Sequence, residues 1–293
     1  MCGFEDNTKM ALDIKALQEW IGKREFRSDQ VTAAPIVALS ATLDRDDPAP
    51  QSGDPLPPLW HWLYFLPVTR QSALGDDGHA RRGGFLPPIP LPRRMWAGSR
   101  LQFHRALNIG EGISRTSVIS DVSHKEGRSG SLVFVTVRHE IRNAEGIAIG
   151  EEQDVVYREN PKPGDPVTVP KSAPESPDWQ RMICPDPVLL FRYSALTFNG
   201  HRIHYDRPYA TEVEGYSGLV VHGPLIATLL LDLLRRNVPD KAVSRFSFRA
   251  VRALFDTAQF AVCGRMAGDK KSVELWAQDV DGWLAMEATA TLL

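Results

Sequence analysis

The stretch Tyr193-Ser-Ala-Leu-Thr-Phe-Asn199-Gly-His201-Arg-Ile-His204-Tyr-Asp206 is followed, eighteen residues after its last histidine, by His222-Gly-Pro-Leu225 and an apolar run. Two imidazoles and a side-chain amide lie within six residues, and a predicted helix begins at Gly223-Pro224. The N-terminus of a helix presents unpaired N–H groups and a partial positive charge. Such a cluster can activate water and polarise a carbonyl group together, so we predict that this stretch forms the active site.

The apolar run predicts a buried helix over residues 223–236. Leucine and isoleucine occupy most of its faces, and it ends at Arg235-Arg236-Asn237 before Pro239. Four strands separated by short Asp/Gly turns are predicted after it, at residues 244–254, 259–266, 272–280 and 283–292. Residues 189–196, just before the histidines, also have a strand-like composition.

The first half of the chain shows the same order of one helix followed by a meander. Residues 31–44 predict a buried helix, and residues 113–122, 131–141 and 147–157 alternate apolar and polar side chains as half-buried strands do. Residues 1–30 indicate a loosely periodic opening helix, and the aromatic residues 60–66 indicate a strand. Residues 69–92, rich in Gly, Pro and Arg, predict a long irregular loop of the kind that forms lids or binding elements.

The repeated plan predicts an α+β protein made by duplication of one small domain, in which an antiparallel sheet bends around a helix. We place the N-terminal domain at residues 1–160 and the C-terminal domain at residues 188–293. The proline-rich residues 161–187 are the expected linker.

The composition argues against several classes of function. The 293 residues carry a formal net charge of −2, so no global charge attracts nucleic acid or an acidic membrane. No apolar segment approaches the ~18–20 residues of a membrane span, and the N-terminus carries charges where a signal peptide needs an apolar core. Three widely spaced cysteines without a CxxC pair predict reduced thiols in a cytoplasmic protein.

Asn199-Gly-His201-Arg-Ile-His204, together with His222-Gly-Pro-Leu225, resembles the motif of the MaoC-type (R)-specific enoyl-thioester hydratases and 3-hydroxyacyl-thioester dehydratases. Within them the chain most resembles the type 2 hydroxyacyl-thioester dehydratases, including mesaconyl-C4-CoA and itaconyl-CoA hydratases. The other matching segments are Leu56-Pro-Pro-Leu-Trp-His-Trp62, Gly83-Gly-Phe-Leu-Pro-Pro88, Arg192-Tyr-Ser-Ala-Leu-Thr-Phe-Asn199 and Phe248-Arg-Ala-Val-Arg252, so the likeness covers nearly the whole chain. It implies a double hot-dog fold, with catalysis in the C-terminal hot dog and a degenerate N-terminal hot dog that shapes the acyl tunnel.

The resemblance also implies a hydro-lyase without cofactor or metal. Its reaction is the reversible hydration of a 2-enoyl thioester to the 3-hydroxyacyl thioester, and its partner is an acyl-CoA or acyl-carrier-protein thioester. A short branched or dicarboxylic C5 acyl group, mesaconyl-C4- or itaconyl-like, is the substrate that the subgroup suggests. Hot-dog proteins commonly associate, so we expect a homo-oligomer, a dimer or higher.

Hydration requires a water near the β-carbon, a base for its proton and donors to the thioester oxygen. His204 is the predicted general base and acid, since an ordinary imidazole pKa of about 6.5 lies near neutral pH. The Gly223 N–H is predicted to stabilise the enolate, and one such donor contributes roughly 3–4 kcal/mol. Most MaoC-type hydratases have aspartate where this chain has Asn199, and an amide accepts no proton. Asn199 is therefore expected to hold the water or the thioester carbonyl, and a purely structural role stays open for all three residues.

Flanking residues are predicted to contact the substrate: Tyr193, His201, Arg202, His222, Arg249 and Arg252, the last two as phosphate contacts. Arginines of the 70–95 segment, Arg81, Arg82, Arg93 and Arg94, are expected to cover the pantetheine. The three-residue spacing of His201 and His204 also permits a metal site, but no Asp, Glu or Cys has matching spacing and we predict none. We expect Asp206 to act as a cap or structural residue.

Two other classes of function stay open. The missing aspartate is compatible with a non-catalytic acyl-thioester binding protein. A hot-dog thioesterase would require a carboxylate near the central helix, for which Glu212 and Glu214 are the nearest candidates.

Overall fold

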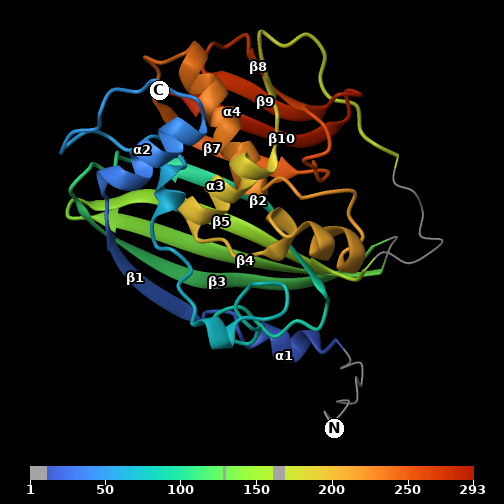
Figure 1. Ribbon diagram of the computed structural model, residues 1–293. Helices are drawn as coiled ribbons and strands as arrows, with labels where there is room; N and C mark the ends of the chain where they lie inside the picture. Colours follow the sequence, from blue (N-terminus) through green and yellow to red (C-terminus); the bar gives the residue numbers. More distant parts are fainter. Residues whose placement is uncertain (1–11, 128–129, 161–168) are drawn as a thin grey trace.

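The computed structural model describes residues 12–127, 130–160 and 169–293. Its strands form one ten-stranded antiparallel sheet in the order β1-β3-β4-β5-β2-β7-β10-β9-β8-β6. Figure 1 shows this sheet curving around helices α2, α3 and α4. Each half of the chain supplies five neighbouring strands, so the duplication predicted from the sequence is visible in the strand order.

The strands of the N-terminal half are β1 (Arg24–Gln30), β2 (Arg93–Phe103), β3 (Gly112–Gly127), β4 (Gly130–Asn143) and β5 (Gly146–Arg158). The predicted meander is confirmed in β3, β4 and β5, which extend beyond the predicted ends. The prediction of an opening helix over residues 1–30 was wrong for its second part. Among the described residues of this range only α1 (Ile14–Gln18) is helical, and Arg24–Gln30 pairs residue by residue with β3. Residues 1–11 of that prediction lie outside the described residues. Pairing with a neighbouring strand outweighs a weak local helix preference.

The strands of the C-terminal half are β6 (Trp179–Ile183), β7 (Val243–Ala250), β8 (Phe260–Met266), β9 (Ser272–Asp279) and β10 (Leu284–Leu292). The four strands predicted after the central helix are confirmed as β7 to β10. Strand β6 lies in the proline-rich stretch expected to be a linker, and it closes the sheet by pairing with β8. Residues 161–168 of that stretch lie outside the described residues.

The two halves join through β2 and β7, which pair from Gly98 opposite Arg249 to Gln102 opposite Arg245. A side chain at position 98 would place its Cβ 2.3 Å from the Phe248 carbonyl oxygen, so only glycine fits at the start of this pairing. One apolar core then runs through both halves. The sheet is thus continuous across the middle of the molecule.

Helix α4 (Gly223–Asn237) confirms the predicted central helix, and α2 (Ala33–Thr42) confirms the helix of the first half. Helix α3 (Pro187–Thr197) forms where the sequence suggested a strand. Asp186 accepts a hydrogen bond of 2.8 Å from the Leu189 N–H, and Pro187 occupies the first turn. These N-terminal signals outweigh the strand-like composition.

The strand predicted at residues 60–66 is instead the short 3₁₀ helix η1 (Trp60–Leu63). The side chains of His61 and Trp62 both reach the Glu151 carboxylate, at 3.3 and 3.2 Å. Consecutive side chains of a strand point to opposite faces, so this shared partner requires a turn. The remaining short elements are η2 (Gln71–Ala73), η3 (Arg202–His204) and the π-helical turn η4 (Tyr209–Val213).

A buried carboxylate fastens the two halves together on the α4 side of the core. Asp232 of α4 bonds Arg45 at 2.8 Å, Arg181 at 3.1 Å and Arg236 at 2.7 Å. Arg45 follows α2, whereas Arg181 belongs to β6.

No helix in the described part of the chain is long and apolar enough to cross a membrane.

Candidate active site

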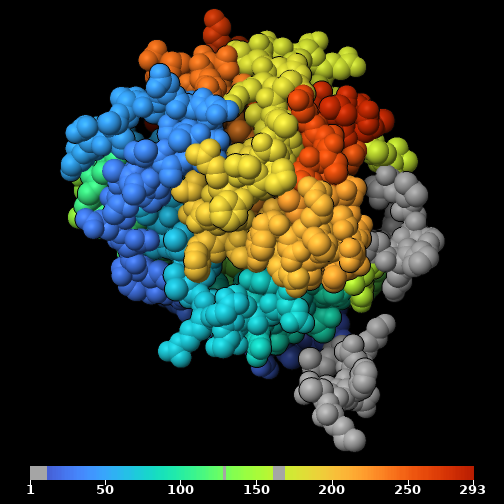
Figure 2. Space-filling model, viewed as in Figure 1, coloured from blue at the N-terminus to red at the C-terminus, as the bar shows by residue number. Residues whose placement is uncertain are grey.

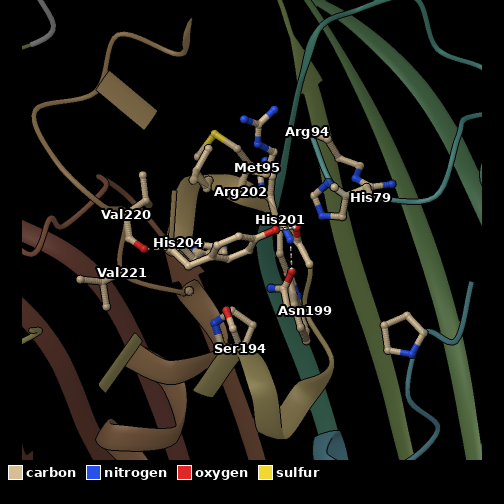
Figure 3. A pocket seen from close by; sticks show the side chains of 18 of the residues that line it. His79, Arg94, Met95, Ser194, Asn199, His201, Arg202, His204, Val220 and Val221 are labelled. Atoms are coloured by element: carbon tan, nitrogen blue, oxygen red, sulfur yellow. Dashed lines mark hydrogen bonds between the residues drawn. The ribbon is translucent and has the colours of Figure 1, made fainter. Parts of the chain in front are cut away.

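A cavity of about 960 Å³ opens where the two halves meet. The N-terminal half lines it with residues 67–86 and the first residues of β2, and the C-terminal half lines it with the end of α3, residues 198–205 and the start of α4. Figure 2 shows the surface loop near residue 80 lying against the segment near residue 210. The predicted histidine cluster lies inside this cavity (Figure 3).

His204 lies on η3 and is almost fully buried while still lining the cavity. Its Nδ1 donates a 2.7 Å hydrogen bond to the Val220 carbonyl oxygen, which fixes the tautomer and leaves the Nε2 lone pair as the free base. The ring stacks on that of His222, with centroids 3.7 Å apart and planes 17° from parallel. Burial lowers the pKa of His204 to about 4, so the imidazole is neutral at physiological pH.

His222 and Tyr193, predicted as substrate contacts, lie behind His204 rather than at the main cavity wall. His222 is fully buried, and its Nε2 shares a 2.8 Å hydrogen bond with Ser194 Oγ. Tyr193 packs edge-on against the His222 ring at 5.1 Å. Burial holds the pKa of His222 well below its usual range, so it supports its neighbour as a neutral ring. These two residues therefore hold His204 in place.

Asn199 follows the left-handed residue Phe198 that ends α3. Its backbone N–H donates to the Ser194 carbonyl at 2.8 Å, and its Oδ1 accepts the His201 N–H at 3.0 Å. The side-chain oxygen is thus used within the turn, which leaves the Nδ2 amine as the group available to the cavity. Asn199 is suited to donate a hydrogen bond to an oxygen atom, and not to accept a proton.

Gly223 is the first residue of α4 and lines the same cavity. A Cβ built on it would meet only the Trp96 carbonyl oxygen, at 4.0 Å, so open space lies directly in front of its backbone. Its N–H donates to no backbone acceptor within the described residues. Pro224 occupies the first turn without losing a hydrogen bond. Among the described residues, the start of α4 therefore leaves an N–H group without a backbone acceptor beside the cavity.

His201 meets a group that the sequence prediction missed, Asp77 and His79 of the long N-terminal loop. The ring centroids of His201 and His79 lie 4.1 Å apart, and His79 Nδ1 lies 3.0 Å from Asp77 Oδ2. Burial lowers the pKa of His201 to about 2 and also lowers the pKa of His79. Burial acts to raise the pKa of Asp77, but the His79 hydrogen bond lowers it below its usual range. The pair is thus a neutral imidazole donating to a carboxylate.

Two glycines lock this loop against the histidine segment. A Cβ on Gly78 would lie 1.9 Å from the Gly200 carbonyl oxygen, and Gly78 has φ +86°. The Arg202 N–H donates to the Asp77 carbonyl at 2.9 Å, and its guanidinium donates to the Asp76 carbonyl at 3.0 Å. The contact fixes the loop as one wall of the cavity.

The predicted arginines differ in position. Arg202 lines the cavity with its guanidinium paired to Asp206 at 2.8 Å, which gives Asp206 the structural role expected. Arg252 also lines the cavity and pairs with Asp279 at 2.7 Å. Arg249 does not line it: it lies exposed on the sheet and pairs with Glu287 at 2.6 Å.

Asp77, His79 and His201 also place three possible metal-ligand atoms within 4.8 Å of one another. His204, the partner of His201 in the metal site considered from the sequence, is not in this group. Asp77 is already bonded to His79, and the charge of Arg94 acts on both histidines. A cation would be added next to an existing positive charge, which disfavours metal binding here.

A second cavity of about 340 Å³ shares His79, Trp96, Asn199 and Pro224 with the first and extends into the N-terminal half. Its wall is polar. The buried Glu151 accepts hydrogen bonds from Trp62 Nε1 at 3.2 Å and Ser99 Oγ at 3.0 Å, besides its contact with His61. Glu212 and Glu214, the carboxylates considered for a thioesterase, line neither cavity.

Comparison with known proteins places the chain in a family. A family model described as hydroxyacyl-thioester dehydratase type 2 matches residues 59–256. The chain is 51% identical over 276 residues to the mesaconyl-C(4)-CoA hydratase of Chloroflexus aurantiacus, covering 93% of this chain and 96% of that protein.

Two solved structures show the same fold. A MaoC-like dehydratase superposes with a TM-score of 0.70 at 13% identity, covering 96% of this chain and 99% of that one. A Mycobacterium tuberculosis protein described as having a double hot-dog fold superposes with a TM-score of 0.57 at 12% identity, covering 96% and 98%. The double hot-dog fold predicted from the sequence is confirmed.

Proposed function

Because the chain belongs to the hydroxyacyl-thioester dehydratase type 2 family, it is a hydro-lyase for 2-enoyl thioesters, and we propose that its substrate is a C5 dicarboxylic acyl-CoA such as mesaconyl-C4-CoA. The observation that carries this proposal is the 51% identity, over 93% of the chain, to a mesaconyl-C(4)-CoA hydratase.

In the proposed mechanism His204 handles both protons. The oxygen of one water bonds to the β-carbon while Nε2 takes a proton from it, and the C=C electron pair moves onto the thioester oxygen as an enolate. The His204 imidazolium then returns the proton to the α-carbon. The pKa of about 4 is lower than the ordinary value on which the sequence prediction relied, so His204 takes the proton from water less readily and returns it to the α-carbon more readily.

Gly223 and Asn199 are proposed to place the two oxygens. The Gly223 N–H, at the positive end of α4, donates to the thioester oxygen as negative charge develops there. The Asn199 Nδ2 amine donates to the attacking water and orients its lone pair toward the β-carbon. The amide replaces the usual carboxylate, so only one titrating base remains in this step.

The experiment follows mesaconyl-C4-CoA and crotonyl-CoA by loss of the enoyl-thioester absorbance, with thiol titration in parallel. Loss of absorbance without free CoA is the expected result. Free CoA would indicate a thioesterase, and no change with measurable binding would indicate a binding protein.

His204→Gln tests the base and is expected to lower kcat by about 10²–10⁴-fold. His124→Gln, on β3 and away from both cavities, is the matched control and is expected to retain activity. An unchanged kcat in His204→Gln would contradict the assignment.

We also propose an N-terminal domain of residues 1–160 and a C-terminal domain that begins with β6 (Trp179–Ile183), ahead of the predicted start at residue 188, and ends at residue 293. Catalysis is proposed in the second domain, and the first is proposed to shape the acyl pocket. A CoA rather than an acyl-carrier-protein thioester is the preferred substrate form, by analogy with the Chloroflexus relative. A homo-oligomer, a dimer or higher, and a cytoplasmic location remain predictions. Light scattering of the purified protein tests the first of these.

A further inference from the structure

We propose that Arg94 is the specificity-determining residue of this enzyme and binds the free carboxylate of the acyl group, an inference that rests on the proposed function. The carboxylate of mesaconyl-C4-CoA is attached to the carbon that receives the water. Its binding group must therefore lie in the same cavity as His204, and Arg94 lines that cavity.

Arg94 is distinguished by its lack of a protein counter-ion. Three guanidinium groups line the cavity, and those of Arg202 and Arg252 are paired with Asp206 and Asp279. Within residues 12–127, 130–160 and 169–293, no carboxylate lies within 4.0 Å of the Arg94 guanidinium. A half-buried cation without a carboxylate partner among the described residues is suited to bind an anionic ligand.

The surroundings of Arg94 fit a carboxylate that is held close to the reacting carbon. Figure 3 shows Arg94 beside His79, on the side of the cavity where His201 also lies. The centroid of the His201 ring is 4.1 Å from that of His79 and 5.4 Å from that of His204, so His79 and His201 form a row of rings that leads from the neighbourhood of Arg94 to the base.

The charges around Arg94 leave it free for the substrate. The nearby carboxylate, Asp77, already accepts a hydrogen bond from His79. His79 and His201 are held neutral by burial, with Arg94 adding to the effect, so neither competes with it for an anion. A guanidinium can donate two parallel hydrogen bonds to a carboxylate, which also fixes which face of the β-carbon meets the water.

The alternative anion at Arg94 is a phosphate of CoA, and the experiment separates the two by using pantetheine thioesters, which carry no phosphate. The ligands are saturated, so binding is measured without turnover: 3-carboxybutyryl-pantetheine, and isovaleryl-pantetheine, in which a methyl group replaces the carboxylate. Arg94→Gln is compared with wild type, with Arg94→Lys, and with Arg252→Gln, whose guanidinium lines the same cavity but is already paired.

We expect Arg94→Gln to weaken binding of the carboxylated ligand about 100-fold and to leave the Kd of isovaleryl-pantetheine within about threefold. Arg94→Lys should recover part of the loss, and Arg252→Gln should leave the ratio of the two Kd values unchanged. An equal loss for both ligands in Arg94→Gln, or no loss, would overturn the inference. Failure of the proposed function looks different, because wild type would then leave the absorbance of mesaconyl-C4-CoA unchanged.

Discussion

Lowering the pH from 7.5 to 5.5 tests the state of His204 directly. Burial lowers its pKa to about 4, so about 97% of it is still neutral at pH 5.5. An unperturbed imidazole with a pKa of about 6.5 would be only about 9% neutral at the same pH. Since the neutral form is the base, we expect kcat/KM for hydration to stay nearly constant over this interval and to fall only below about pH 5.

The assay measures kcat/KM from pH 4.5 to 8 with a pantetheine thioester, because the phosphates of CoA titrate near pH 6 and would add their own step. Circular dichroism at each pH confirms that the protein remains folded. A tenfold fall in kcat/KM by pH 5.5, in folded protein, would refute the buried-base assignment.

The same shift has a consequence for stability. Between pH 6.5 and 4 the unfolded chain binds a proton at His204 that the folded chain does not, so the free energy of unfolding decreases as pH falls through this window. Over this whole pH interval the contribution of His204 lowers the free energy of unfolding by about 3 kcal/mol. Urea unfolding at pH 7 and 5 should show a smaller difference in His204→Gln than in wild type, and equal differences would contradict the shift.

Three further changes test other parts of the structure. Gly78→Ala forces a Cβ against the Gly200 carbonyl at positive φ, so it should raise KM severalfold and destabilise the protein by about 1–3 kcal/mol. Steady-state kinetics and urea unfolding measure the two effects, and Gly84→Ala, whose added Cβ would have nothing within 4 Å, is the control. Gly223→Pro removes the proposed N–H donor and should lower kcat by about 10²–10³-fold, whereas Gly223→Ala keeps the donor. Similar kcat values for the two variants would refute the role of this N–H group in stabilising the enolate. Asp232→Ala removes the buried carboxylate that Arg45, Arg181 and Arg236 share, and should lower the free energy of unfolding by about 1–3 kcal/mol. A change below about 0.5 kcal/mol would show that the cluster contributes little.

Much of the fold follows from local patterns. Helix α4 and strands β7 to β10 have long, regular apolar periodicity, so their prediction is confirmed. Helix α3 was mistaken for a strand because the prediction relied on its composition and overlooked the N-terminal cap at Asp186 and the proline in its first turn, which decide its structure. Strand β1 was missed because its polar sequence is held by pairing with β3, about ninety residues later, and not by its own preference.

The candidate site divides in the same way. His204 and Asn199 belong to one six-residue motif that resembles a known family, and Gly223 begins a recognisable helix, so the sequence was enough to propose them. Asp77 and His79 lie more than a hundred residues earlier in an irregular loop, and only the fold brings them to His201. A signal was present in Gly75-Asp-Asp-Gly-His79, a tight turn that ends in a histidine.

Arg249 shows a different kind of error, which the sequence alone could have avoided. Phe248 is buried in the core, and neighbouring residues of a strand face opposite sides of the sheet. Arg249 must then face outward, as its pairing with Glu287 shows.

Both walls of the candidate active-site cavity belong to one polypeptide chain, and the pairing of β2 with β7 holds the two halves together. A cavity formed between separate chains is lost when the enzyme is diluted below the dissociation constant of those chains. Here Arg94 and His204 remain at a fixed effective concentration however dilute the solution becomes. Turnover per molecule should therefore be independent of protein concentration down to the nanomolar range, even if larger assemblies come apart.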